Sequence, residues 1–280
     1  MPTEIVLTAE VLRAFSAHLL RAEKSPATVE KYERGARMLA AWLEGPLTRE
    51  AALGWKAALA AGRTAAGANG LLAAMNSLAE FLHRPEMKVK LFRIQRRLFA
   101  ARERELTRPD LDRLLQTADR LGKARLRLVM QTLFATGIRV SELRFITVGA
   151  AVRGRAEIRL KGKTRTILIP TQLCRLLSQY AGTHGVGSGP VFVTRGGLPL
   201  DRSNIWTEMK RLCTRAGVAP DKVFPHNLRR LFARVYYRRT PNLAELADLM
   251  GHSNVNTTRI YTASTGAEFR RRLDALGLVT

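Results

Sequence analysis

The chain has 280 residues and an ordinary hydrophobic content of 46%, so it is long enough for two domains with cores and is not a disordered tail. Its 47 Lys and Arg against 23 Asp and Glu give a net charge of +24, far more than solubility requires. This charge indicates a polyanionic partner, and we expect a nucleic acid; a basic protein bound at a membrane surface is the alternative.

The sequence carries no targeting or disulfide signal. Its first residues lack a basic segment followed by an apolar run, and no apolar stretch reaches the roughly 18 residues of a membrane span. The two cysteines, Cys174 and Cys213, lie outside any Cys-x-x-Cys or Cys/His cluster, which argues against a zinc site and fits a reducing cytosol. We therefore expect a cytoplasmic protein without a membrane partner.

Residues 1–86 are expected to form a helical domain. Thr8 and Thr48 are suitable N-caps, and Ser25 followed by Pro26 is a typical helix start. The apolar spacing predicts four amphipathic helices, and the last two are expected around 51–61 and 66–83. The candidates for DNA contact among the exposed residues are Lys24, Lys31, Arg34 and Arg37.

Residues 87–105 are expected to form a basic interdomain linker. The segment contains no acidic residue before Glu103. Lys88, Lys90 and Arg93 are therefore expected to lie on the phosphate backbone of a duplex. A linker that is merely solvated is the alternative.

Residues 106–280 are expected to form a second domain, which is mainly helical with a small antiparallel β-sheet. Apolar helices are predicted after the cap Thr107 and over 126–135, before Gly137. Alternating runs over 156–160 and 166–169 predict a β-hairpin, with a turn that contains Lys161, Gly162, Lys163, Thr164 and Arg165. Further helices are expected over 172–181 and 203–216, so the fold class is α+β.

Residue types that suit phosphodiester chemistry gather in the C-terminal quarter. His226 and Arg229 are spaced i, i+3 and share one face of a helix, while Tyr261 lies nine residues after His252. Arg matches phosphate oxygens, His moves a proton near neutral pH, and Tyr can hold a covalent phosphoester. Upstream, Arg139 is expected close to a helix N-terminus, where anions are favoured.

Two segments resemble the motif boxes of the tyrosine recombinases, the phage-integrase and Xer family. The first is Ala135-Thr136-Gly137-Ile138-Arg139-Val140-Ser141-Glu142-Leu143, and the second runs from His226-Asn227-Leu228-Arg229 through Gly251-His252 to Tyr261. A lone His-x-x-Arg is a weak signal, whereas two boxes in the family's order with matching spacings are specific. The N-terminal helices are similar to the family's core-binding domain, with Ser25, Thr28 and Tyr32 in its S-x-x-T-x-x-x-Y pattern.

The resemblance implies a catalytic role for the boxed residues. Arg139 and Arg229 would clamp the scissile phosphate and offset the charge that grows in the transition state. His252 would add a hydrogen bond, Tyr261 would attack to form a 3′-phosphotyrosyl link, and His226 is the candidate proton acceptor. No metal or other cofactor is expected for this route.

The resemblance also implies a lysine on the hairpin, which protonates the leaving 5′-oxygen. Lys161 matches the family's position best, and Lys163 is the alternative and a further candidate for DNA contact. Two positions depart from the family. Arg230 stands where many members have a second His, and Phe145–Ala150 lacks an Asp that many members carry after Ser-Glu-Leu. Neither position belongs to the catalytic set.

Residues 266–279 are expected to form a tail helix with the apolar stripe Phe269, Leu273 and Leu276. In relatives, a C-terminal segment packs into a neighbouring protomer. The resemblance therefore implies a homo-tetramer on two DNA sites with this tail exchanged in trans, and docking on its own domain is the alternative.

The sequence thus predicts a site-specific recombinase of double-stranded DNA, associated with the bacterial nucleoid. Integration, excision, inversion and resolution all fit. A type IB topoisomerase and a catalytically silent DNA-binding accessory factor are the alternatives.

Overall fold

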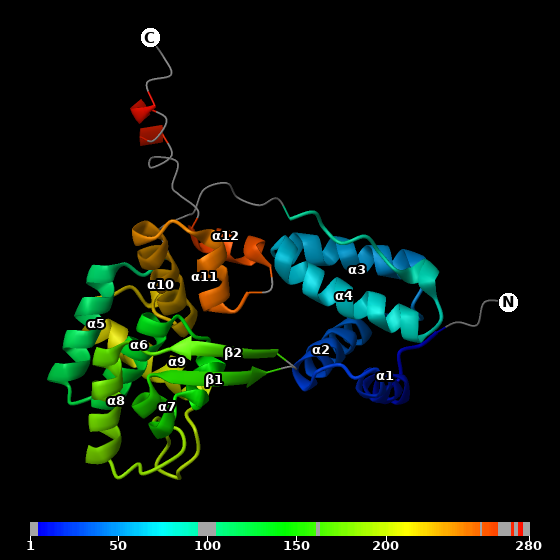
Figure 1. Cartoon of the computed structure of the whole chain (residues 1–280). Coiled ribbons are helices and arrows are strands. Elements are labelled where there is room, and N and C mark those ends of the chain that lie inside the picture. Colours follow the sequence, from blue (N-terminus) through cyan, green and yellow to red (C-terminus); the bar gives the residue numbers. More distant parts are fainter. Residues whose placement is uncertain are drawn as a thin grey trace. The chain divides into compact units, whose positions relative to one another are not determined.

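The computed structural model of the chain describes residues 5–94, 105–160, 163–252, 254–262, 270–271 and 274–276. The chain divides into two compact units, Met1–Arg96 and Arg97–Thr280 (Figure 1). The described residues are mainly helical with one two-stranded antiparallel sheet, which confirms the α+β class. The domain bounds expected from the sequence, 1–86 and 106–280 with a linker over 87–105, stay a prediction.

The N-terminal unit contains the expected four helices: α1 (Ala9–Arg21), α2 (Pro26–Trp42), α3 (Arg49–Gly62) and α4 (Ala65–Phe81), followed by the 3-10 turn η1 (Pro85–Met87). Thr8 and Thr48 cap α1 and α3 as predicted, with hydroxyls that accept from Val11 N at 3.3 Å and Ala51 N at 3.1 Å. Ser25 is the N-cap residue of α2 and Pro26 lies in its first turn, as predicted. The hydroxyl of Ser25 makes no capping bond to the backbone and contacts the hydroxyl of Thr28 at 2.9 Å instead.

The segment after η1 is fastened to α4. The carboxamide of Asn76 pairs with the backbone of Val89, at 2.9 Å in both directions. Asn69 pairs with the backbone of Phe92 in the same way, at 2.9 and 2.8 Å. Arg49 donates to the Lys88 carbonyl at 2.5 Å. The first half of the expected linker is therefore anchored on the N-terminal unit by hydrogen bonds that the sequence pattern did not indicate.

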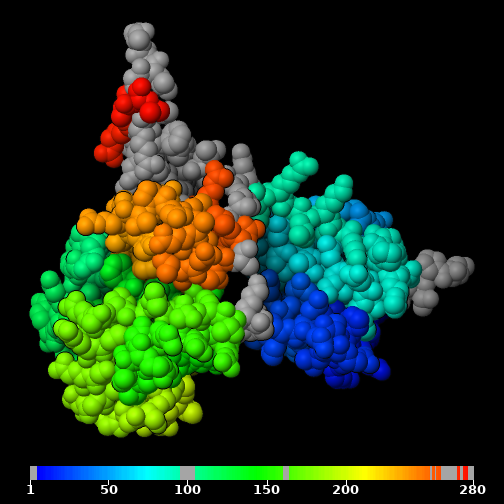
Figure 2. Space-filling view, in the orientation of Figure 1, coloured from blue at the N-terminus to red at the C-terminus, as the bar shows by residue number. Residues whose placement is uncertain are grey.

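The second unit is built around α6 (Ala124–Thr136), whose buried residues come from most of its faces. The elements packed with it include α5 (Arg108–Arg120), α7 (Val148–Arg153), α8 (Thr171–Thr183), α9 (Arg202–Arg215) and α10 (Pro225–Arg239). Next to α10 lie α11 (Leu243–Met250) and α12 (Val255–Thr262). Figure 2 shows the orange residues of α10 to α12 packed against the green residues of the preceding helices.

The hairpin is longer than predicted. β1 (Arg155–Leu160) and β2 (Lys163–Leu168) pair in antiparallel register, with Ile158 opposite Arg165 and Leu160 opposite Lys163. The prediction that Lys163, Thr164 and Arg165 lie in the turn is therefore wrong. These residues continue the period-2 pattern of the strand, so only two residues connect the strands.

No helix in the described ranges is long and apolar enough to cross a membrane. Nor do three or more His, Cys, Asp or Glu side chains in those ranges gather where they could hold a metal ion. The expected tail helix falls mostly outside the described residues, as do Phe269 and Leu273.

Candidate active site

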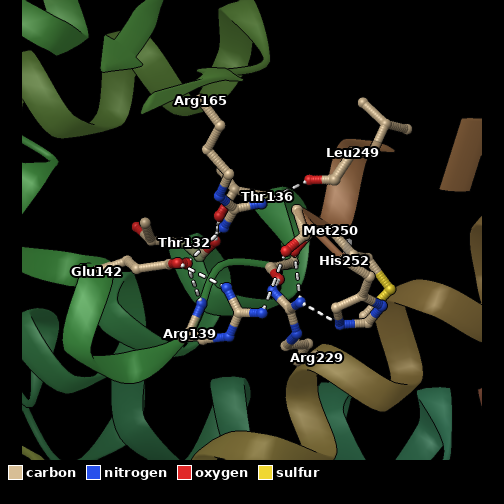
Figure 3. Close-up of polar contacts among 11 residues, drawn as sticks. Thr132, Thr136, Arg139, Glu142, Arg165, Arg229, Leu249, Met250 and His252 are labelled. Carbon is tan, nitrogen blue, oxygen red and sulfur yellow. Dashed lines mark hydrogen bonds and ion pairs between the residues drawn. The ribbon is translucent and has the colours of Figure 1, made fainter. Parts of the chain in front are cut away.

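The C-terminal end of α11 lies at the centre of the site. The last carbonyls of a helix lack partners inside the helix and carry the negative end of its dipole. Here Arg165 donates to the carbonyl of Leu249 at 2.9 Å, Arg229 to that of Met250 at 2.6 Å, and Arg139 to that of Gly251 at 3.3 Å (Figure 3). Three guanidinium groups from separate elements therefore meet at one helix end.

Arg229, on the first turns of α10, is buried, with 1% of its surface exposed. Besides the Met250 carbonyl, its guanidinium donates to the Gly137 carbonyl and to Nε2 of His252, the latter at 2.8 Å. A buried charge is tolerated only when its donors are bonded, and these bonds also fix its orientation. Arg229 is therefore held rigidly before any ligand arrives.

Arg139 is the accessible arginine of the cluster. It is the N-cap residue of the 3-10 helix η3 (Val140–Phe145), as expected from its place after Gly137. Its side chain is 44% exposed, although Nη1 donates to Oε1 of Glu142 at 2.9 Å. The guanidinium is thus oriented on one side and open on the other, as a group that receives a phosphate must be.

Two residues of the site were missed by sequence reasoning, Glu142 and Arg165. The Glu142 side chain is 2% exposed, and its Oε2 accepts from Arg165 Nη2 at 2.5 Å and from the backbone N–H of Arg139 at 2.7 Å. Glu142 stands three residues after Arg139, a spacing that signals an interacting pair on a helix. No local spacing indicates the partners of Arg165, because Glu142 and Leu249 are distant along the chain.

The two histidines lie among these cations. Nε2 of His252 accepts from Arg229, since a guanidinium cannot accept, so Nδ1 carries the proton and donates to Oγ1 of Thr258 at 2.7 Å. Burial, followed by the charges of Arg229, Arg139 and Arg165, lowers the pKa of His252 from 6.5 to about 4. Burial, and then the charges of Arg230 and Arg229, lowers the pKa of His226 from 6.5 to about 4. Both imidazoles are neutral at pH 7.

A pH titration followed by NMR of the imidazole nitrogens is expected to find both histidines neutral at pH 6, where an ordinary histidine is mostly protonated. The folded state binds fewer protons than the unfolded one between pH 6.5 and about 4, so the stability contributed by these groups is lost as the pH falls through this window. Arg230→Gln should raise the pKa of His226 and leave that of His252 in place. Titration of either histidine near 6.5 in the wild type would contradict this electrostatic environment.

Of the remaining predicted residues, the structure describes Tyr261 and Lys163 by their backbone only. Tyr261 belongs to α12, three residues after Thr258, and Lys163 is the first residue of β2. Lys161 lies outside the described residues. The other candidates for DNA contact belong to the N-terminal unit, where all are exposed except Lys88, which is half-buried and pairs with Glu80 at 3.3 Å; the exposed ones are Lys24, Lys31, Arg34, Arg37, Lys90 and Arg93.

The site thus combines a buried and an exposed arginine with two neutral imidazoles, next to a helix that carries a tyrosine, and these residue types suit chemistry on a phosphodiester. The chain belongs to the phage integrase family, whose family model matches residues 104–268. It is a tyrosine-type site-specific recombinase of the Xer type. The predicted class and activity are thereby confirmed.

Two relatives and two solved structures illustrate the similarity. The chain is 30% identical to tyrosine recombinase XerA of Thermococcus kodakarensis over 96% of each chain. It is 31% identical to XerD of Xanthomonas campestris pv. campestris, over 56% of this chain and 54% of that protein. A lambda integrase dimer bound to a COC′ core site has a TM-score of 0.75 at 18% identity, over 92% of this chain and 96% of the other. XerH bound to its difH substrate has a TM-score of 0.69 at 16% identity, over 100% of this chain and 91% of the other. At these identities, both structures show similarity of fold alone.

Proposed function

We propose that the protein cleaves and rejoins double-stranded DNA in the cytoplasm through a 3′-phosphotyrosyl intermediate. The observation that most supports this is the set of bonds made by Arg229. The Gly137 and Met250 carbonyls and His252 fix the buried guanidinium of Arg229 in one orientation, so its positive charge is in place before DNA binds. Such preorganised charge stabilises the charge that develops on a phosphate during substitution.

The proposed chemical step assigns one role to each of these groups. Arg139 and Arg229 hold the non-bridging oxygens of the scissile phosphate, and His252 donates to the same group once the imidazole reorients or takes up a proton. The phenolic oxygen of Tyr261 forms a bond to phosphorus as the bond from phosphorus to the 5′-oxygen breaks. The phenolic proton passes to His226, whose lowered pKa of about 4 keeps it neutral and able to accept.

The leaving 5′-oxygen takes its proton from a hairpin lysine, which is Lys161 in this proposal, with Lys163 as the alternative. Attack of a 5′-hydroxyl on the phosphotyrosine reverses the step and rejoins the strand, so no nucleotide cofactor is consumed. The backbone position of Tyr261, one helical turn after the Thr258 that binds His252, supports its assignment as the nucleophile.

We propose that residues 1–86 of the N-terminal unit form a core-binding domain that binds the DNA duplex. The candidate contacts of the unit are lysines and arginines, all exposed except the half-buried Lys88. Because each phosphate contact releases counterions from the DNA, the logarithm of the binding constant should fall linearly with the logarithm of the salt concentration. Val89 and Phe92 are hydrogen-bonded to asparagines of α4, so Lys90 and Arg93 lie on a segment that is fixed to the N-terminal unit. This anchoring supports a role for both residues in phosphate binding.

The active assembly is proposed to be a homo-tetramer on two DNA sites, with the tail exchanged between protomers. Solved neighbours of this chain include a lambda integrase tetramer bound to a Holliday junction. Leu276, from the expected apolar stripe, is 64% exposed within the isolated chain, which supports a partner for it in the assembly. Phe269 and Leu273 would complete that contact.

The test uses a nicked duplex that bears a verified binding site, so that cleavage releases a short fragment and traps any covalent intermediate. Wild-type protein is expected to give a band of lower mobility on a denaturing gel, and Tyr261→Phe none. Tyr237→Phe is the matched control, because Tyr237 packs in the small cluster with Met250, and it should still form the adduct.

Tight binding without an adduct in the wild type would favour the accessory-factor alternative. An adduct that survives in Tyr261→Phe would mean that another residue is the nucleophile. Relaxation of supercoiled DNA that lacks any binding site would favour the topoisomerase alternative.

A further inference from the structure

Arg165 ties the β-hairpin to the catalytic cluster. It lies on β2, opposite Ile158, and its side chain is 16% exposed. One side of its guanidinium donates to Oε2 of Glu142 at 2.5 Å, and Nη1 donates to the carbonyl of Leu249 at 2.9 Å (Figure 3). A single side chain therefore joins the strand to η3 and to the end of α11.

These bonds define a rigid joint, because each partner is itself held. Glu142 is buried, and its carboxylate also binds both the backbone and the side chain of Arg139. Leu249 is followed by the two residues whose carbonyls bind Arg229 and Arg139. A planar guanidinium that bonds in two directions fixes both distance and angle, which a lysine ammonium does not.

Close packing at Gly251 restricts Arg165 further. A Cβ at Gly251 would lie 2.5 Å from Cδ, 2.6 Å from Nη1 and 2.7 Å from Nε of Arg165, so the arginine lies directly against the glycine backbone. Nε is buried, and among the described residues it has no hydrogen-bond partner. The side chain thus has little freedom to move away from the end of α11.

The hairpin has only two rungs beyond this joint. After the pair Ile158 and Arg165 come Arg159 with Thr164, and then Leu160 with Lys163. Two residues of a strand span about 7 Å. β1 and β2 pair only with each other in the described sheet, so side-chain contacts rather than further strands hold the hairpin against the rest of the unit. Among these, the hydrogen bonds of Arg165 tie the hairpin to the arginine cluster.

We infer that Arg165 is a positioning residue, which holds the β1–β2 hairpin against the end of α11 so that the hairpin lysine reaches the leaving 5′-oxygen. This inference rests on the proposed function, in which that lysine is the proton donor. Arg165 itself does not touch the phosphate. Its loss should weaken proton donation while the clamp formed by Arg139 and Arg229 still binds the DNA.

The test compares two nicked substrates, one with the ordinary 5′-bridging oxygen and one with sulfur at that position. A thiolate leaves without a proton, so the sulfur substrate no longer needs the general acid. Single-turnover cleavage is measured for the wild type and for Arg165→Gln, Lys161→Ala and Lys163→Ala. Arg165→Lys is a second variant in case the glutamine variant does not fold.

Arg165→Gln is expected to slow cleavage of the oxygen substrate by about 10-fold to 100-fold, because general acid catalysis would be lost only in part. Cleavage of the sulfur substrate should slow far less. Arg165→Lys should give a smaller change of the same kind. Arg159→Gln is the matched control, since Arg159 lies one rung away and its side chain is 78% exposed. It removes the same charge from the hairpin and should leave the ratio of the two rates as in the wild type.

An equal slowing of both substrates by Arg165→Gln and Arg165→Lys would overturn the inference, because it would mean that Arg165 supports the whole site. If sulfur rescues the responsible lysine variant but neither arginine variant, the inference fails and the proposed function stands. If sulfur rescues neither lysine variant, the proposed proton donor is wrong, and this is a failure of the proposed function.

Discussion

Arg229→Gln is expected to reduce DNA cleavage by about 10²-fold to 10³-fold, the usual effect of removing one preorganised donor from an oxyanion site. The substitution removes the charge that, in the proposed mechanism, stabilises the scissile phosphate. It also leaves the Gly137 carbonyl, the Met250 carbonyl and His252 Nε2 without the donor that now satisfies them. At about 1 kcal/mol or more for each buried acceptor, the free energy of unfolding should fall by roughly 3 kcal/mol.

The catalytic and the structural part of this effect can be separated. Single-turnover formation of the adduct and a urea titration are measured on the same preparation. Arg234→Gln is the control: this arginine lies on the same helix with its side chain 15% exposed, but binds Glu105 and the Leu106 carbonyl. Arg234→Gln should be less stable than the wild type but cleave DNA at the wild-type rate. Equal losses of cleavage in the two folded variants would show that Arg229 acts only through the fold.

Gly251→Ala is expected to lower both stability and cleavage. Gly251 has a φ of +63°, a conformation that costs a residue with a Cβ roughly 1–2 kcal/mol. The added Cβ would also lie within 2.7 Å of three atoms of Arg165, and either the arginine or the end of α11 must move. Because His252 and the Met250 carbonyl lie beside Gly251, we expect cleavage to fall by at least about 10-fold, as for other displacements at a catalytic site.

Gly154→Ala is the matched control for this substitution. Gly154 ends α7 with a φ of +70°, and nothing lies within 4 Å of the position of its Cβ. The variant therefore carries the backbone cost without the collision. It should melt at a lower temperature than the wild type but cleave the nicked substrate normally. The same cleavage rate in both alanine variants would argue that the contact of Gly251 with Arg165 has no role in the reaction.

Much of this molecule follows from short stretches of sequence. Thr8, Thr48 and Thr107 cap helices because a hydroxyl and the backbone N–H it receives are only a few residues apart. The sequence pattern predicted the four helices of the first unit and α5, α6, α8 and α9 of the second, but not α7, α11 or α12. The two boxes predicted the family, since the residues within each box are close in sequence. Tyr261 and Lys161 were also named from spacing, and their roles stay predictions.

Contacts between residues that are far apart in the sequence determine the remaining features of the fold and the site. Arg165 meets Leu249, which is 84 residues away, and Asn69 pairs with Phe92, which is 23 residues away; neither contact has a local signal. The hairpin proved longer than its apolar runs, because backbone pairing extends wherever two strands stay in register. The histidines are neutral because packing buries them among arginines, which come mainly from the same helix for His226 and from other elements for His252. Residue types and spacings determine the available chemistry, whereas burial and charge, which are set by the three-dimensional packing, determine how each group is held and ionised.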